Sequence, residues 1–593
     1  MSPVIGIDFG TTNSLCAWLD GDRPSVIPNA RGARATPSVV AFTAKGETLV
    51  GESAKNQAYI NPENTISGVK RLLGSGSLLS MGGKSWRVEE IVAIVLSSLK
   101  RDAEAYLGCP VERAAITAPA HFSDLERRAL SEAGRIAGLE ILRIVNEPTA
   151  AALARAWEES KAGASSEGEA PSLVLVYDFG GGTFDVTLLS RKGEECRVLA
   201  SRGDGRLGGT DIDREISRLA TERFKREGLD PDADRFLAQQ LIEAAERAKI
   251  ELSERPRAPI ALAFAHAGGR IVHPSFELSR DELEALAGPF VERSLDLVER
   301  VLRDAGVDCS RVDSLVLSGG SSRMPIVRRL LEERLAIKPE GAVNPEEIVA
   351  QGAAVCAELA SGSSEAARRL KVRDVVSRTY GVEIDGGAFF PLIRKNSPVP
   401  ASQSRLFTTV ADEQDSVEIH VLQGESPQVS ENLSLGRFLL AGIGSAKAGM
   451  PRVRVDFSID ESDMLHVQAV DLGSGREQAI SISDLDRGAS DEGAAELAAK
   501  TALLAARLTE LASSPLLERS LERGLEAEIE ELEGRARAAA SGGERLSEGA
   551  LRRLKAELEG MVGELLARGS ESRGFDREWK TASAAGPARE PRP

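Results

Sequence analysis

The chain has 593 residues, 42% of them hydrophobic, and a formal net charge of −17. This length predicts several domains, and the acidic balance argues against a sequence-independent nucleic-acid binder, which normally needs a basic face. The five cysteines are far apart, odd in number and form no Cys-x-x-Cys, so we expect buried free thiols and neither a disulfide framework nor a zinc site. With no secretory signal and no long apolar run, we expect no membrane span and a cytoplasmic location.

The hydrophobic pattern changes along the chain, and these changes predict the domain order. Up to about residue 360, apolar runs such as Val4–Ile7 and Val174–Tyr177 alternate with helix-like segments such as 88–107, as in α/β proteins. Apolar residues then recur at every second position, as in strands, and finally at every third or fourth, as in helices. The predicted parts are an α/β domain (1–360), a linker (361–374), a β-sandwich (375–485), a helical bundle (486–569) and a disordered tail (570–593).

A sequence pattern that predicts a strand followed by a turn occurs twice, about 170 residues apart. "VIGIDFGTTN" begins at Val4 and "LVLVYDFGGGTFDV" at Leu173, each an apolar run followed by Asp-Phe-Gly, small residues and a threonine. Glycines let such a turn approach a ligand, its amides and hydroxyls suit phosphate, and Asp178 and Asp185 could orient Mg²⁺ through waters. Singly, each turn could be an ordinary hairpin or bulge. If the two turns face each other across a cleft, they would bind one polyphosphate from both sides.

Further motifs fit the same chemistry. "VLSGGSSRMP", from Val316, could hold a nucleotide at a helix N-terminus, with Arg323 stacking on the base. "VKRLLG", "NEPTAAALA", "LGGTDID", "EAAERAKIELS" and "NPEEIVAQGAAV" occur with these motifs, and "TVADEQDSVEIHVLQGE" and "GMPRVRVDFSIDESDMLHVQAVD" follow in the β region. With this set, in this order, the chain resembles the Hsp70 (DnaK-type) chaperone family over nearly its whole length, as a divergent bacterial paralogue. The helical C-terminus is similar only in character.

This resemblance implies an actin-like α/β ATPase domain with two lobes around a nucleotide cleft, a β-sandwich peptide-binding domain and an α-helical lid. It implies slow ATP hydrolysis that controls the binding and release of exposed apolar segments of unfolded proteins. The implied cofactors are ATP or ADP, Mg²⁺ and K⁺. The implied partners are apolar peptides, a J-domain co-chaperone and a nucleotide exchange factor, but no nucleic acid or membrane, and we expect a monomer.

The family's site residues carry over by position. Those implied in hydrolysis are Asp8, Lys70, Glu147, Asp178, Thr183 and Asp185. Of these, Asp8, Glu147 and Asp178 would meet Mg²⁺ through water, and Lys70 would position the attacking water. Those implied in nucleotide binding are Gly10, Thr11, Thr12, Asn13, Gly180, Gly181, Gly182, Gly208, Gly209, Glu246, Lys249, Ser253, Gly319, Gly320, Ser321 and Arg323.

The resemblance also implies a peptide pocket and a relay between the domains. The expected pocket residues are Val382, Ile384, Asp385, Phe407, Val410, Val417 and Ile419. The pattern alone allows that most of them are sandwich core. Pro119, Arg127 and Asp374 match the relay, with Asp374 in the linker facing Arg127.

Some positions depart from the family's pattern. Lys371 and Arg373 interrupt a linker that is usually a run of leucines, so we expect weaker docking of the linker. "PAHFSD" carries His121 where tyrosine is usual, near the surface for the J-domain. These changes keep an alternative open, a nucleotide-gated scaffold that binds one dedicated partner. A small-molecule kinase of the same superfamily would have no use for the β domain.

Overall fold

The computed structural model describes residues 2–481, except residues 59, 162–170, 264, 268–269, 340–343, 363–369, 385, 415, 442, 444–445, 451 and 474–476. Contacts divide the chain into two compact units, 1–482 and 483–593. The predicted lid (486–569) and tail (570–593), as well as Asp385, therefore lie outside the described residues. The finer domain boundaries stay predictions.

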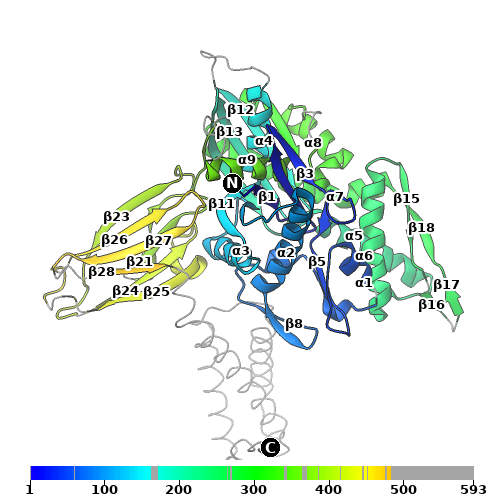
Figure 1. Cartoon of the computed structure of the whole chain (residues 1–593), viewed down its shortest axis with the longest axis horizontal. Coiled ribbons are helices and arrows are strands. Elements are labelled where there is room, and N and C mark those ends of the chain that lie inside the picture. Colours follow the sequence, from blue (N-terminus) through cyan, green and yellow to red (C-terminus); the bar gives the residue numbers. More distant parts are fainter. Residues whose placement is uncertain are drawn as a thin grey trace, which may run out of the picture. The chain divides into compact units, whose positions relative to one another are not determined.

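The first lobe is built on a sheet with the strand order β11-β10-β1-β2-β3, in which β4 also pairs with β2 (Figure 1). The strands are β1 (Val4–Asp8), β2 (Asn13–Asp20), β3 (Arg23–Ile27), β4 (Thr36–Pro37), β10 (Arg113–Ala118) and β11 (Glu140–Asn146). Smaller elements of this lobe are β5 (Val39–Phe42), β6 (Thr48–Val50), β7 (Thr65–Ser67), β8 (Leu78–Met81), β9 (Lys84–Arg87), η1 (Pro62–Asn64), η2 (Val69–Leu72), α1 (Glu52–Gln57), α2 (Val88–Leu107) and α3 (Asp124–Ile136). A capping box starts α3, because Ser123 and Glu126 each accept the other's backbone N–H.

The second lobe repeats this sheet. Its order is β19-β12-β13-β14-β20, and β12 pairs parallel to β19 and antiparallel to β13, just as β1 pairs with β10 and β2. The strands are β12 (Ser172–Phe179), β13 (Phe184–Lys192), β14 (Glu195–Asp204), β19 (Ser314–Ser318) and β20 (Lys371–Arg373). The rest of this lobe comprises β15 (Arg257–Ala261), β16 (Ala265–Ala267), β17 (Arg270–Val272), β18 (Ser275–Ser279), α5 (Gly209–Arg226), α6 (Arg235–Leu252), α7 (Arg280–Asp304), α8 (Pro325–Leu335), η3 (Pro231–Ala233), η4 (Cys309–Arg311) and η5 (Gly320–Arg323). The repeated motif therefore belongs to a repeated sheet pattern.

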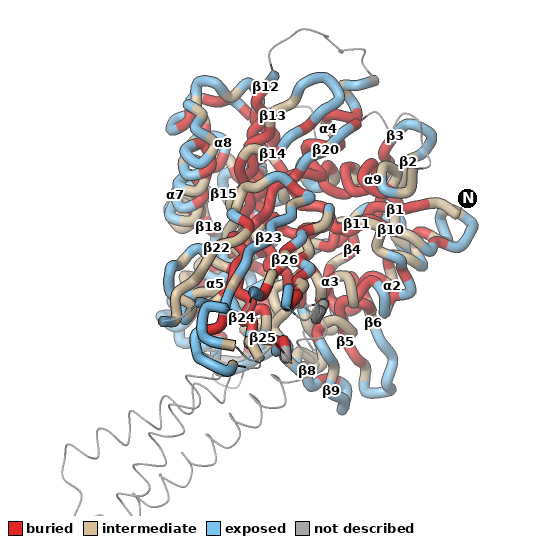
Figure 2. Tube along the Cα trace, turned by 90° about the vertical axis from the view of Figure 1, so that its left-hand side faces the viewer, coloured by how far each residue is buried: buried red, intermediate tan, exposed pale blue. Residues whose placement is uncertain are grey.

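Two helices, α4 (Glu147–Lys161) and α9 (Ile348–Ser361), join the sheets. Their apolar residues share one core with Val4 and Val145 from the first sheet and with Val176 and Val316 from the second. The helices approach so closely that a Cβ on Gly352 would lie 1.7 Å from the Ala150 carbonyl oxygen. Figure 2 shows α9 and the central strands largely buried. This joint core fixes the strand ends that carry the two turns.

The β domain consists of two antiparallel four-stranded sheets, β22-β21-β24-β25 and β23-β26-β27-β28. The strands are β21 (Tyr380–Ile384), β22 (Ala388–Ile393), β23 (Ala401–Phe407), β24 (Ser416–Gln423), β25 (Leu433–Ala441), β26 (Val453–Ile459), β27 (Leu465–Asp471) and β28 (Glu477–Ser481), with the short helix η6 (Val429–Glu431). The alternation is clearest in β26, where Val453, Val455, Phe457 and Ile459 are all buried. The period of two predicted these strands correctly.

The end of the linker pairs with the second sheet, and the expectation that its charges weaken docking stays a prediction. Residues 371–373 form β20, which pairs parallel to β14 at the edge of the second sheet. Lys371 and Arg373 are exposed, whereas Leu370 is buried and Val372 half-buried. Alternate strand residues point to opposite faces, so the charges stay in solvent while the apolar side chains meet the second lobe. Arg373 also pairs with Glu195 on β14, at 3.1 Å.

Candidate active site

The two repeated turns face each other. A Cβ on Gly181 would lie 2.1 Å from Thr12 Oγ1, and one on Gly182 would lie 2.4 Å from Thr11 Cγ2. Because real side chains do not approach this closely, only glycines let the second turn meet the first. The chain thus brings backbone amides and hydroxyls from both lobes to one place.

A cavity of about 470 Å³ lies between these turns. Its walls hold most of the predicted residues, namely Asp8, Gly10, Thr11, Thr12, Asn13, Lys70, Glu147, Asp178, Gly180, Gly181, Glu246, Lys249, Ser253, Gly319, Gly320, Ser321 and Arg323. Thr183 instead lines an adjoining cavity. Gly208 and Gly209 lie behind the wall, where they pack against Gly181. Sequence reasoning missed Asp213, Ile250 and Ser318, which also line the cavity.

Buried charge is concentrated at one end of this cavity. Lys70 Nζ and Glu147 Oε1 form an ion pair, and Asp8 accepts a hydrogen bond from Thr117 Oγ1 at 2.9 Å. Burial raises the pKa of Glu147 to about 7, although Lys70 opposes the shift. Burial likewise raises the pKa of Asp8, and it raises the pKa of Asp178 well above its ordinary value. Several carboxylates thus share one lysine, an excess of negative charge that suits a cation.

The donor set fits Mg²⁺ held through water. Among the described residues, no three acidic, histidine or cysteine side chains are grouped closely enough to hold a metal ion directly. Magnesium usually keeps several of its waters and binds through one or two carboxylates and the phosphates of a substrate. The carboxylates here therefore match the indirect role that the family resemblance implies.

Asp185 has a partner that the sequence interpretation did not anticipate. Its Oδ1 lies 3.1 Å from Nδ1 of His121, while its buried Oδ2 has no hydrogen-bond partner among the described residues. Burial lowers the pKa of His121, but the neighbouring Asp185 carboxylate more than compensates, so that this pKa is raised. The departure at "PAHFSD" thus belongs to the cleft, where the segment after β10 of the first lobe meets β13 of the second.

The opposite end of the cavity is held by ion pairs between side chains. Lys249 Nζ lies 2.8 Å from Asp213 Oδ2, and Lys55 of the first lobe lies 2.8 Å from Glu246 of α6. Arg323 pairs with Glu346 at 2.9 Å, which fixes its guanidinium plane. Glu246 and Lys249, expected to contact adenosine, thus pair with other side chains. Ile250, largely exposed beside them, adds an apolar surface that suits a base.

The predicted relay residues gather where the β domain contacts the first lobe. Asp374 accepts hydrogen bonds from Asn146 Nδ2 at 3.0 Å and Thr149 Oγ1 at 2.9 Å. Arg127 is bonded to Asn146 Oδ1 at 2.6 Å and lies 3.5 Å from Asp463 of the β domain. Arg127 and Asp374 are therefore connected through Asn146, which bonds to both of them. Pro119 is buried directly after β10, and its carbonyl accepts the N–H of Phe122.

The turn between β26 and β27, with the start of β27, adds further bonds to this contact. Asp124 Oδ1 accepts the N–H of Leu465 at 2.7 Å, and Ser462 Oγ accepts the N–H of Ile144 at 3.2 Å. Asp124 begins α3, and Ile144 lies on β11, so both anchor points belong to the lobe that carries Lys70. The β domain is thus bonded to elements that lead directly to the cleft.

Comparison with known proteins agrees with this geometry. The family profile described as Hsp70 protein matches residues 4–79 and 75–561. The chain is 44% identical over 494 residues to the chaperone protein DnaK of Thermotoga maritima, covering 82% of each chain. It is 45% identical over 485 residues to that of Thermotoga neapolitana, covering 81% of this chain and 80% of the relative.

The chain belongs to the Hsp70 family. It is accordingly an ATPase and an ATP-dependent chaperone, and the Hsp70 family binds ATP or ADP with Mg²⁺. In the part of the chain that the structure describes, no helix combines the length and apolar character needed to cross a membrane.

The residues expected to form the Hsp70 peptide pocket do not share one environment. Val382 and Ile419 are buried, at 3% and 5% exposure, and belong to the sandwich core. Ile384 and Val410 are exposed, at 37% and 72%, while Val417 is half-buried. Phe407 is half-buried and meets Phe390 edge-on, with ring centroids 6.0 Å apart. Exposed apolar side chains thus lie on the β domain, but two of the predicted residues serve its core.

Proposed function

We propose that the cleft hydrolyses ATP slowly and that its nucleotide state controls the release of apolar segments of unfolded proteins from the β domain. The observation that carries the proposal is the buried Lys70–Glu147 pair among surplus carboxylates, facing phosphate-binding turns from both lobes. Phosphoryl transfer depends mainly on positioning and on stabilisation of charge, which such a site supplies.

We assign each group of cleft residues a role in ATP hydrolysis from its position. Gly10, Thr11, Thr12 and Asn13 would donate hydrogen bonds to the phosphates from one lobe, and the glycine turn from Gly180 would do so from the other. Asp8, Glu147 and Asp178 would hold Mg²⁺ through its waters, and the ion would neutralise charge on the phosphates. Lys70 and the unpartnered Oδ2 of Asp185 would orient the attacking water, and Thr183 would meet the γ-phosphate. Since none of the described residues expected beside that water is a strong base, we expect slow turnover.

His121 would act on this water indirectly. Its bond to Asp185 Oδ1 holds the carboxylate so that Oδ2 remains free for the water. A histidine in this place also connects the cleft to the start of α3, where the β domain is bonded. We propose that this connection, together with Asn146, carries the nucleotide state to Asp374 and the linker.

On the β domain, an extended peptide would gain backbone hydrogen bonds and place apolar side chains against Ile384, Val410, Val417 and Phe407. Asp385 would favour peptides with basic flanks. We further propose a J-domain co-chaperone and a nucleotide exchange factor as partners, K⁺ as an additional ion, a monomeric state and a cytoplasmic location.

The experiment that tests this function measures which peptides bind. An array of unrelated unfolded sequences is probed with the full chain in ADP, and single-turnover ATP cleavage is measured in parallel. A chaperone binds many apolar segments and cleaves ATP. Binding to one sequence alone would favour a dedicated scaffold, and absence of cleavage would refute the active site.

A further inference from the structure

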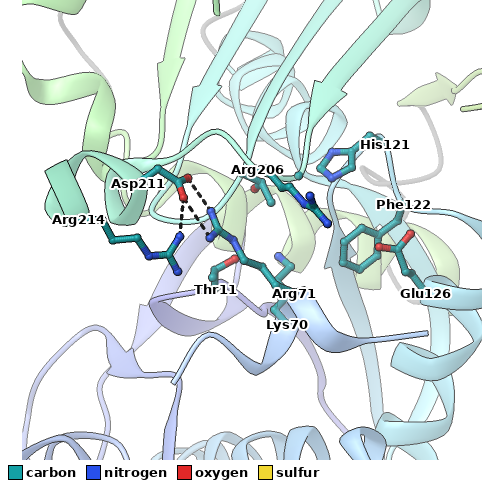
Figure 3. A pocket seen from close by; sticks show the side chains of 11 residues that line it. Thr11, Lys70, Arg71, His121, Phe122, Glu126, Arg206, Asp211 and Arg214 are labelled. Atoms are coloured by element: carbon teal, nitrogen blue, oxygen red, sulfur yellow. Dashed lines mark hydrogen bonds and ion pairs between the residues drawn. The ribbon is translucent and has the colours of Figure 1, made fainter. Parts of the chain in front are cut away.

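A second cavity, of about 250 Å³, adjoins the nucleotide cleft (Figure 3). It shares Thr11 and Lys70 with the nucleotide cavity, and Thr183 also lines it. These are the residues expected at the γ-phosphate. Its other walls come from η2, the start of α3 with the residues before it, the turn after β14 and the first turns of α5. The two cavities therefore meet where the γ-phosphate of ATP would be cleaved.

Cations dominate the lining of this second cavity. Lys70, Arg71, Arg206 and Arg214 contribute positive charge and His121 adds a ring nitrogen, against the carboxylates of Asp211 and Glu126, and Figure 3 shows these side chains around one space. An arginine fork suits phosphate because it donates parallel hydrogen bonds to two oxygens.

The two carboxylates are already occupied by other groups. Asp211 pairs with Arg71 at 2.8 Å and with Arg214 at 2.9 Å. Glu126 accepts hydrogen bonds from the N–H and the hydroxyl of Ser123, both at 2.6 Å. The Arg206 side chain has no hydrogen-bond or ion-pair partner among the described residues, and only its backbone N–H is engaged, by Asp204. One guanidinium is therefore free to bind an anion in this cavity.

Arg71 ties the lobes together at this point. Besides its pair with Asp211, its Nε donates to the carbonyl of Gly182 at 3.0 Å, so a side chain of η2 holds both the second turn and α5. With this bridge formed, the second cavity adjoins the nucleotide cavity at Thr11 and Lys70, and Thr183 also lines it. A phosphate cleaved from ATP could therefore enter the second cavity while ADP fills the main one.

We propose that the second cavity is a binding subsite for the inorganic phosphate released from ATP, with Arg206 as its principal ligand. The inference rests on ATP hydrolysis at the adjoining cleft. It adds a site that binds the phosphate product while ADP is still bound. The cleaved group leaves as phosphate with no further covalent step, so only hydrogen bonds and charge are exchanged in the subsite.

The test measures the affinity of inorganic phosphate for the full chain saturated with Mg²⁺ and ADP, by calorimetry. Arg206→Met weakens phosphate binding about tenfold or more, the scale of one hydrogen bond between charged groups. Glu126→Gln keeps the shape of the α3 cap but removes a negative charge, and it strengthens binding severalfold. Arg218→Met is the matched control, because Arg218 lies on α5 outside the cavity and pairs with Glu215 and Glu222. It leaves phosphate affinity unchanged.

A second measurement follows a single turnover, with cleavage of ATP and appearance of free phosphate recorded separately. In Arg206→Met, the ratio of the release rate to the cleavage rate rises about tenfold. Phosphate binding that depends on Arg206 supports the subsite whatever the cleavage rate, so failure of the active site would be seen separately. Phosphate affinity and release that are the same in wild type, Arg206→Met and Glu126→Gln overturn the proposal.

Discussion

The nucleotide cleft and the face of the β domain were predicted from the same resemblance, yet they differ in how well their residues converge. In the cleft, residues from both lobes line one cavity and bond to one another, as Lys70 does to Glu147. On the β domain, the expected pocket residues range from buried Val382 to exposed Val410. Polar groups in a cleft need particular partners, whereas an apolar side chain on a strand can serve the core or a ligand equally well.

The largest expected effect is in the cleft. Lys70→Ala removes the lysine that is bonded to the buried Glu147, and we expect ATP cleavage to fall by a factor of about 10² or more, while ATP still binds. Single-turnover cleavage and nucleotide affinity are the measurements. The control is Lys84→Ala, an exposed lysine on β9 that should change neither value. Normal cleavage by Lys70→Ala would refute its assignment to the active site.

The next largest effect distinguishes a core residue of the β domain from a surface residue. Val382→Ala should lower the free energy of unfolding of this domain by about 2 kcal/mol, the scale for losing two buried methyl groups. Ile384→Ala, two residues further along β21, should leave stability nearly unchanged but weaken binding of an apolar peptide severalfold. Denaturant titration and fluorescence anisotropy measure the two quantities. The comparison between the regions breaks down if Val382→Ala changes only peptide affinity.

The sequence predicted best those features that depend on the ends of strands. Asp8, Asp178 and Gly319 directly end or follow buried strands, so the apolar runs located them and the repeat indicated that they would meet. Contacts between side chains on elements that are distant in the sequence could not be predicted in the same way. His121 follows β10 of the first lobe and reaches Asp185 on β13 of the second, and Asp374 meets Arg127 through Asn146. These contacts depend on packing, which periodicity does not record.

The linker is a second feature whose structure depends on packing that composition alone does not record. Lys371 and Arg373 predict weaker docking because they replace leucines that could be buried, and the strength of docking stays a prediction. The strand pairing of β20 sends both charges to solvent and keeps Leu370 buried. Only knowledge of which face meets the ATPase domain distinguishes these outcomes.

A pH effect links the two regions. Burial raises the pKa of Asp463 from its ordinary value of 3.8 to about 6, although Arg127 opposes the shift. The docked form therefore binds a proton more tightly than the undocked form, so this group favours docking at low pH and loses that effect as pH rises from about 4 to 6. The fraction of docked molecules, measured by the distance between two dyes, should fall over this range. Asp463→Asn, which tolerates the positive φ of this residue, should reduce the slope. Equal slopes in both proteins would exclude Asp463 as the titrating group.

The smallest expected effect concerns the charged linker. Arg373 and Glu195 form an exposed pair, with 61% and 46% of their side chains accessible, so Arg373→Ala should weaken docking by about 0.5 kcal/mol or less. Leu370→Ser, which places a hydroxyl where a buried leucine packs, should weaken docking considerably more. The same two-dye distance measures both variants. A larger loss from Arg373→Ala would mean that the charge itself holds the strand.

We propose that the cleft controls the β domain through the docked linker and the contacts of Arg127. The dissociation rate of a labelled apolar peptide from the full chain, measured in ATP and in ADP at physiological potassium and magnesium, tests this control. We expect release many times faster in ATP than in ADP. Equal rates with tight binding in both nucleotides would contradict it, because the two regions would then be joined without being coupled.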